Sequence, residues 1–533
     1  MKRILQPSYQ KLFLTLLSIF GSIVCVTAVM AQETESPETS AAQKYGVWND
    51  KEDASGEKIL QMRLRVYPKA EPVPAFKHRL IPAANDRVDG NAALFYLKAM
   101  GFFEQHNARE QLTKLERKWR EEASEEQRDS GDYPPNNWAD AAPESLPLDQ
   151  VRQYLELQQF QPEFLYDAAR RTRFEHDRAI EREPNPIGYL LPSIQQHRQL
   201  ARVQNVRCRF AMAEGRVDDA VEIVGQMLAM GQHLGSDQFL VTGLVGIACH
   251  GIGVETGLVL SQQPDTPNLY WAIAACPAID LSPSFAFERD LLFLQMPMLK
   301  EVTEEVRPPG YWADFIKPFV KLRNEFFPLV SSANGKTIEN WDHWQAVTAI
   351  ARDYPIARDF LRQVVGLSDR QLDQYPTAQV VFLAMVKYYE FLQDEQMKQY
   401  VVPYASLSKI SESPWADQWK AKFNFNEHSY LAIASALPAH YEQILQAAAR
   451  AEQWKKLWQT VEALRMTAAG NGGELPDSLD QLNVPAPIDP VTNRPFEYEL
   501  NEGIATLKGA RLRTSWEIKL ELAKLDQQEE KTK

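Results

Sequence analysis

The feature that most constrains the fold is a helical pattern that runs from Asn91 to about Leu464. Apolar residues recur along it at three- and four-residue spacing, and prolines and glycines divide it into short segments. Glycine is scarce, with 24 copies in 533 residues, which favours helices over a turn-rich β architecture. A chain of this length exceeds one ordinary domain and can bury a large core. We therefore predict a mostly α fold whose body is an irregular, solenoid-like set of helical hairpins.

One hairpin in this body has a repeat-like signature. Helices predicted over 192–213 and 217–233 are joined at Gly215, which lies five residues before Ala220. A glycine permits a tight turn, and an alanine lets two helices approach closely. The spacing resembles the tetratricopeptide hairpin, although no second copy follows at the tetratricopeptide period. We predict one tetratricopeptide-like helix pair at 192–233.

The amino terminus has the pattern of an export signal. Three basic residues precede an uncharged stretch over residues 12–29, and Val29-Met30-Ala31 places small or branched residues where a signal peptidase needs them. This pattern predicts cleavage between Ala31 and Gln32 and an exported protein, periplasmic or extracellular. The alternative is a membrane anchor at residues 12–29, because the stretch reaches the lower edge of a membrane-spanning length.

The two ends of the chain differ from the helical body. Alternating apolar residues from Leu60 to Val66 predict one strand, and the prolines after it predict an extended strap. Near the carboxy terminus, Gly503 lies between two strand-like runs and predicts a small β-hairpin. The predicted organisation is a signal peptide at 1–31, a flexible lead at 32–57, the strap at 58–90, the helical body at 91–439, and a long helix with a small α+β tail at 440–533.

Three segments together resemble a large group of bacterial exported proteins with no assigned activity. The segments are the strap EPVPAFKHRLIP…DGNAALFY, the helical run GRVDDAVEIVGQMLAMGQHLGSDQFLVTGLVGIAC, and the tail VEALRMTAAGNGGELPDSLDQL…PIDPVTNRPFEYEL. They cover about a quarter of the chain. The resemblance implies export and a helical body, and it carries no catalytic residue over to this sequence.

The tail alone also resembles the carboxy-terminal region of type II secretion pseudopilins. There a long helix leads to a Pro-x-Ser-Leu turn, a loop with Asp-Pro and a small sheet. The matching residues are Pro476, Ser478, Leu479, Asp489, Pro490, Pro495 and Tyr498. The amino terminus lacks a prepilin processing site, so the resemblance implies a shared local motif.

Charge and cysteine content exclude two classes of protein. The net charge of -13 argues against general nucleic-acid binding, which needs a basic surface. Beyond the leader the chain keeps Cys208, Cys249 and Cys276. Three cysteines allow at most one internal disulfide, so the chain is not a disulfide-stabilised scaffold, and whether any of them pair is left open.

No catalytic, cofactor-binding or metal-binding residue follows from motifs. The nine histidines form no His-Glu-x-x-His pair, and neither Cys-x-x-Cys nor Gly-x-Ser-x-Gly occurs. We therefore predict no cofactor and no metal, and the sequence favours a non-enzyme over an enzyme.

A candidate binding surface comes from two constellations. On a helix predicted over 237–262, four glycines share one face with His250; this face either lets a neighbouring helix cross closely or forms a crevice with His250 as its polar contact. The second constellation is a concentration of ten arginines between Arg170 and Arg216. Guanidinium groups suit recognition of carboxylates or anionic saccharides, but an internal ion-pair ladder to acidic helices such as 104–126 is the alternative. The candidate residues are Arg198, Arg202, Asn205, Arg209 and His250.

These observations favour an exported, non-catalytic helical scaffold or binding protein of the cell envelope. Its expected partner is another protein or an envelope polymer, without nucleic acid, and with a membrane only if the leader stays uncleaved. Two alternatives remain open. One is an envelope hydrolase acting on glycan or peptide, with carboxylates brought together by folding, and the other is a pilus or secretion accessory protein.

Overall fold

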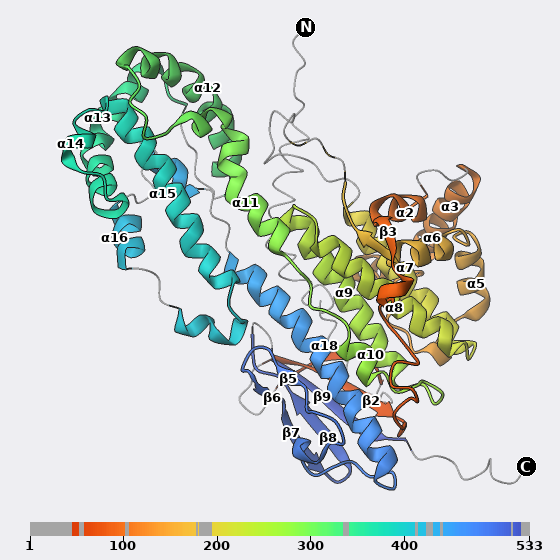
Figure 1. Cartoon of the computed structure of the whole chain (residues 1–533). Coiled ribbons are helices and arrows are strands. Elements are labelled where there is room, and N and C mark those ends of the chain that lie inside the picture. Colours follow the sequence, from red (N-terminus) through yellow and green to blue (C-terminus); the bar gives the residue numbers. More distant parts are fainter. Residues whose placement is uncertain are drawn as a thin grey trace, which may run out of the picture. The chain divides into compact units, whose positions relative to one another are not determined.

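The chain is mostly helical, which confirms the predicted fold class (Figure 1). The computed structural model describes residues 45–52, 58–101, 106–176, 178, 180, 194–333, 340–410, 414–422, 430–436, 441–512 and 515–523. The predicted cleavage site at Ala31 and Gln32 lies outside these residues. The regular stacking of a solenoid remains a prediction.

The described residues form two compact units, so the predicted helical body at 91–439 is divided between them. The sheet unit contains the described residues of Val26–His176, Pro192–Ser284 and Gln446–Lys533. The helical unit contains the described residues of Asp177–Leu191 and Phe285–Leu445. Two helices, α11 (Ser282–Gln295) and α18 (Tyr441–Gly470), contribute residues to both units.

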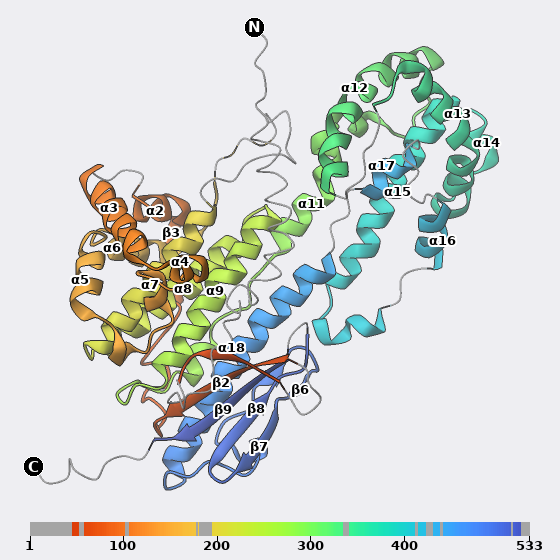
Figure 2. The same cartoon turned by 180° about the vertical axis from the view of Figure 1, so that it is seen from behind.

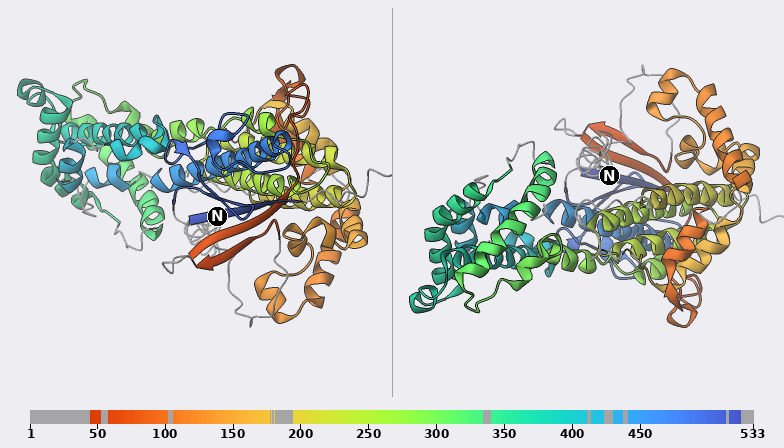
Figure 3. Two further views of the ribbon diagram at one scale, coloured as in Figure 1. Left: turned by 90° about the horizontal axis from the view of Figure 1, so that it is seen from below. Right: turned by 90° about the horizontal axis from the view of Figure 1, so that it is seen from above.

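The sheet unit contains helices α2 to α10, and three of these helices form its centre. Its helices are α2 (Ala92–Ala99), α3 (His106–Glu122), α4 (Glu125–Ser130), α5 (Leu148–Glu156), α6 (Gln161–Ala169), α7 (Ile194–Ala213), α8 (Val217–Gly235), α9 (Leu240–Leu260) and α10 (Tyr270–Ala274). Helices α7, α8 and α9 pack against one another (Figure 3). The turn between α7 and α8 places Gly215 at φ +73°, as the predicted hairpin requires, and Ala220 is buried.

A five-stranded sheet joins the two ends of the chain. The strands are β1 (Trp48–Glu52), β2 (Lys58–Val66), β7 (Glu497–Asn501), β8 (Ile504–Lys508) and β9 (Ser515–Leu522), in the order β1-β2-β9-β8-β7. Two further pairs of short strands are β3 (Val88–Asn91) with β4 (Arg171–Arg173), and β5 (Ile488–Asp489) with β6 (Arg494–Pro495). Figures 1 and 2 show α18 along one face of the five-stranded sheet. There Trp458 and Val461 of α18 share a core with Met62, Leu507 and Ile518 of the strands.

The structure confirms two elements that the sequence predicted for the two ends and adds a third. The strand from Leu60 to Val66 and the hairpin turn at Gly503 (φ +80°) are confirmed. Residues 515–522 of the predicted α+β tail were not predicted as a separate strand, but they form β9, which pairs in parallel with β2. The strap and the tail therefore belong to one sheet, because β9 pairs with β8 along one edge and with β2 along the other.

The helical unit is built around an aromatic core. Its further helices are α12 (Pro309–Ala333), α13 (His343–Phe360), α14 (Asp369–Leu372), α15 (Thr377–Tyr400), α16 (Pro414–Lys422) and α17 (Leu431–Ala436). Phe382 of α15 contacts the rings of Phe319 and Tyr430 at 4.9 and 5.0 Å between centroids. Helix α13 continues through Pro355, which lies on the exposed side of the helix.

Candidate functional site

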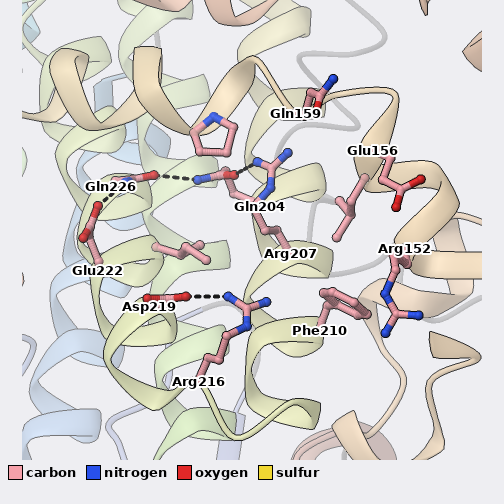
Figure 4. Close-up of a pocket in the computed structure, with 13 residues that line it drawn as sticks. Arg152, Glu156, Gln159, Gln204, Arg207, Phe210, Arg216, Asp219, Glu222 and Gln226 are labelled. Carbon is pink, nitrogen blue, oxygen red and sulfur yellow. Dashed lines mark hydrogen bonds and ion pairs between the residues drawn. The ribbon is translucent and has the colours of Figure 1, made fainter. Parts of the chain in front are cut away.

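The main candidate site is a cleft of about 350 Å³ in the sheet unit, between α5, the start of α6 and the α7–α8 hairpin (Figure 4). It combines three arginines, three acids, three glutamines and a short apolar wall. The lining residues are Arg152, Leu155, Glu156, Gln159, Pro162, Gln204, Arg207, Phe210, Arg216, Asp219, Glu222, Ile223 and Gln226. The numbers of positive and negative side chains balance, so the lining carries no net formal charge.

Apolar packing holds α5 against α7 and so fixes the width of the cleft. Val151 and Tyr154 of α5 are buried in one cluster with Val203, Val206 and Phe210 of α7. The α5 residues that line the cleft, Arg152, Leu155 and Glu156, follow helical spacing beside this buried face, and Leu155 belongs to both. The cleft walls therefore come from packed helices.

At one end of the cleft, two arginines share a carboxylate beside an aromatic ring. Glu214 accepts hydrogen bonds from Arg152 at 3.1 Å and from Arg216 at 2.8 Å, and these guanidinium groups lower the pKa of its carboxyl. Arg216 also pairs with Asp219. Figure 4 shows Phe210 between Arg152 and Arg216, whose guanidinium carbons lie 5.5 and 5.9 Å from the ring centroid. The single aromatic ring of the lining is thus covered by protein cations.

At the other end, a chain of hydrogen bonds runs from a buried arginine to a carboxylate. Arg207 donates to the side-chain oxygen of Gln204. The Gln204 amide donates to Gln226 at 2.7 Å, and the Gln226 amide donates to Glu222 at 3.0 Å. In both Gln204 and Gln226, the side-chain oxygen accepts on the side of Arg207 and the side-chain nitrogen donates on the side of Glu222 (Figure 4). The two amide dipoles are therefore fixed in the same direction.

Arg207 differs from the other two arginines of the cleft in burial and in partners. Its side chain is 9% exposed, and burial lowers its pKa to about 10. Besides Gln204, it donates to the backbone oxygen of Gln158 and to the side-chain oxygen of Gln161, each at 3.2 Å. All three of these acceptors are neutral, and within the described part of the chain no carboxylate forms an ion pair with Arg207.

The same glutamines border a second, smaller cavity. It measures about 220 Å³ and is lined by Gln158 and Gln161 together with residues of α3 and α7, including Leu112, Gln196 and Val203. Arg207 donates to both Gln158 and Gln161. The hydrogen-bond network around Arg207 therefore lies between the cleft and this second cavity.

The sequence-predicted binding surface is not a surface at three of its five residues. Asn205 and Arg209 are 9% and 2% exposed. Arg209 donates to Asn205 at 3.0 Å and to the backbone oxygen of Ala141 at 2.8 Å, and Asn205 donates to the backbone oxygen of Ala139. These two residues anchor the loop around residues 139–141 on α7. The acceptors outside α7 are backbone carbonyls of this segment, so at these two residues hydrogen bonds to backbone stand in place of the alternative ion-pair ladder to the acidic helix 104–126.

The other three predicted residues lie apart from this pair. Arg202 is exposed, and Arg198 is half-buried, with its pKa lowered by burial. His250 is 1% exposed on α9, and its Nδ1 atom has no hydrogen-bond partner among the described residues. Burial and the charge of Lys455 lower the pKa of His250 to about 3. None of the five residues lines the cleft.

The glycine face of α9 is filled by neighbouring helices, which supports the first of the two sequence-based interpretations. A Cβ atom on Gly246 would lie 2.7 Å from the backbone oxygen of Gly231 in α8. A Cβ atom on Gly257 would lie 2.5 Å from the ring of Trp458 in α18. The glycines let α8 and α18 approach closely, and no crevice remains along them.

Helix α9 is also the one described helix that is long and apolar enough to cross a membrane. Most of its apolar stretch is buried inside the protein. This burial is typical of the central helix of a core, as the contacts of its glycines indicate.

The described cysteines and metal-ligand residues offer no alternative site. Cys208, Cys249 and Cys276 are free and buried, and burial raises the pKa of each thiol to about 12. In the described ranges, no group of three or more His, Cys, Asp or Glu side chains could hold a metal ion.

The sequence contained a signal for Arg207, but this residue lies on a different face of α7 from the predicted binding surface. Arg207 belongs to the concentration of ten arginines, whereas the predicted surface used the face of Arg198, Arg202 and Arg209. Two positions separate Arg207 from Arg209, which turns their side chains about 200° apart on a helix. Gln204, one turn before Arg207, and Gln226 give no sequence signal by themselves.

Comparison with protein-family models, with curated proteins and with solved structures gives no match. The geometry of the cleft is therefore what points to a function.

Proposed function

We propose that this chain is a non-catalytic, exported binding protein of the cell envelope, and that it binds a polypeptide segment in the cleft between α5 and the α7–α8 hairpin. The observation that carries the proposal is the lining of that cleft. It offers balanced charges, three side-chain amides and a short apolar wall on packed helices. Such a mixture matches the amide groups and mixed side chains of a peptide.

The arrangement of the cleft favours a peptide over a saccharide. Phe210 is 7% exposed and has two guanidinium groups beside its ring. A sugar therefore finds no open aromatic face in the lining, whereas Gln159, Glu156 and Glu222 leave hydrogen-bonding groups along the cleft.

Two of the three acids that line the cleft are held by protein donors, which supports binding without catalysis. Asp219 is paired with Arg216, and Glu222 accepts from Gln226. A general acid or base needs a carboxyl that can exchange a proton with the substrate, whereas these two acids act as fixed partners of protein donors.

Selection from a random decapeptide library tests the proposal. The full chain is mixed with the library, bound peptides are separated by gel filtration, and both their identity and their integrity are read by mass spectrometry. We expect a subset of peptides to be retained intact. The blocking variant is Gln159→Trp, since Gln159 is exposed on the rim of the cleft, and the matched control is Gln153→Trp, exposed on α5 outside the cleft.

The variant Gln159→Trp should lower retention at least about tenfold, which corresponds to about 1.4 kcal/mol, while Gln153→Trp should retain peptides like the parent chain. Absence of retained peptides, or equal retention by the two variants, contradicts the proposed site. Cleavage of the retained peptides contradicts the non-catalytic role.

A further inference from the structure

We infer that the cleft recognises a carboxylate of its polypeptide ligand, and that Arg207 is the residue that binds it. This inference rests on the proposed function and names the group of the ligand that the site selects. The starting observation is a buried guanidinium whose described acceptors are all neutral. Buried arginines are normally paired with an acid, because removal of a charge from water is costly.

The electrostatic surroundings of Arg207 leave its charge uncompensated. Burial is the main cause that lowers its pKa to about 10, and the opposing effect comes from the Tyr154 hydroxyl, not from a described carboxylate. The fixed amides of Gln204 and Gln226 orient their dipoles toward Arg207, but a dipole does not cancel a net charge. The chain of hydrogen bonds ends at Glu222, so two amide groups separate this carboxylate from the guanidinium of Arg207.

Arg207 also has hydrogen-bonding capacity left. A guanidinium carries five N–H groups, and three hydrogen bonds from Arg207 to protein acceptors are present. The remaining N–H groups belong to a side chain that lines the cleft. Hydrogen bonds between a guanidinium and a carboxylate are among the strongest that proteins make, and they are strengthened where water is excluded.

The other two arginines of the cleft do not have this property. Arg152 and Arg216 are 46% and 44% exposed, and both are bound to Glu214. Their charges are thus screened by water and already paired. Arg207 is therefore the position where a ligand carboxylate gains most.

The test uses four versions of the random decapeptide library. Two have a free carboxy terminus and two have an amidated one; in each pair, one version contains Asp and Glu and the other omits them. We expect the carboxylate-free version to bind at least about tenfold more weakly than the versions with a carboxylate. A loss with amidation assigns the terminal carboxylate, and a loss with omission of Asp and Glu assigns a side chain.

Arg207→Gln provides the matching variant, and its control is Arg202→Lys, exposed on the same helix outside the cleft. The preference for carboxylate-bearing peptides should disappear in Arg207→Gln and persist in Arg202→Lys. If Arg207→Gln does not fold, the comparison of the four libraries on the parent chain still decides whether the protein selects a carboxylate.

Equal binding of all four libraries overturns the carboxylate inference while the proposed peptide-binding function stands. A preference that survives in folded Arg207→Gln also overturns it. Binding of no library overturns the proposed function and the inference together. Inorganic phosphate is the last probe: if it binds in an Arg207-dependent way and peptide carboxylates do not, the site takes phosphate and the inference is wrong.

Discussion

Acid should destabilise the sheet unit through His250. His250 lies on α9 against Gly231 of α8, and its side chain is 1% exposed. Burial is the main cause that lowers its pKa to about 3. The ordinary pKa of histidine is near 6.5, so the unfolded chain takes up a proton at this residue well before the folded chain does. The stabilisation is complete at neutral pH and is lost as the pH falls from about 6.5 toward 3.

The size of this effect follows from the two pKa values. Between pH 7.5 and pH 5.0, the free energy of unfolding should decrease by about 2 kcal/mol through His250 alone. The variant His250→Gln removes the titrating group and should show a pH dependence that is smaller by that amount. The control is His343→Gln, because His343 is exposed on α13.

Urea unfolding followed by circular dichroism at both pH values measures the difference between the parent chain and each variant. The reasoning is refuted if His250→Gln and the parent chain lose equal free energy between pH 7.5 and 5.0. It is also refuted if His343→Gln reduces the pH dependence as much as His250→Gln does.

Two further substitutions test the packing of the sheet unit. Gly246→Ala places a Cβ atom 2.7 Å from the backbone oxygen of Gly231 and should lower the free energy of unfolding by at least about 2 kcal/mol. The control Gly251→Ala on the same helix meets nothing within 4 Å and should raise the free energy of unfolding by up to about 1 kcal/mol. Equal urea midpoints for the two variants would count against the close helix crossing. Glu462→Gln leaves the buried Arg465 without its carboxylate partner and should lower the free energy of unfolding by about 3 to 5 kcal/mol. The control is Glu110→Gln in the exposed pair of Glu110 and Lys114, and it should unfold at the urea concentration of the parent chain. A similarly small effect at Glu462 would show that the buried pair is dispensable.

Local elements of the fold were predictable because short-range patterns specify them. The turn at Gly215 needs a left-handed conformation that glycine adopts without strain, and the same holds for the hairpin turn at Gly503. The pairing of β2 with β9 was not predictable in this way, since it joins residues more than 450 positions apart. Strand β9 itself had a signal: Trp516, Ile518 and Leu520 alternate with charged residues and are all buried.

The candidate site was less predictable than the fold because it depends on partners. The sequence shows that arginines gather between 170 and 216, but burial and hydrogen-bond acceptors decide their roles. Arg209 serves the structure by binding loop carbonyls, whereas Arg207 faces a cleft with only neutral acceptors. The acceptors outside α7 come from segments 46 to 68 positions away, so helical periodicity of α7 alone could not separate the two arginines.

Hydrogen exchange measured by mass spectrometry, on the full chain with and without a peptide selected from the decapeptide library, tests most directly whether the cleft is the binding site. The account predicts slower exchange on peptide addition in α5, in the residues that link α5 to α6, and in the α7–α8 hairpin. It also predicts that this protection is absent in Gln159→Trp. Protection confined to the five-stranded sheet or to the helical unit, with α5 and the α7–α8 hairpin unchanged, would contradict it.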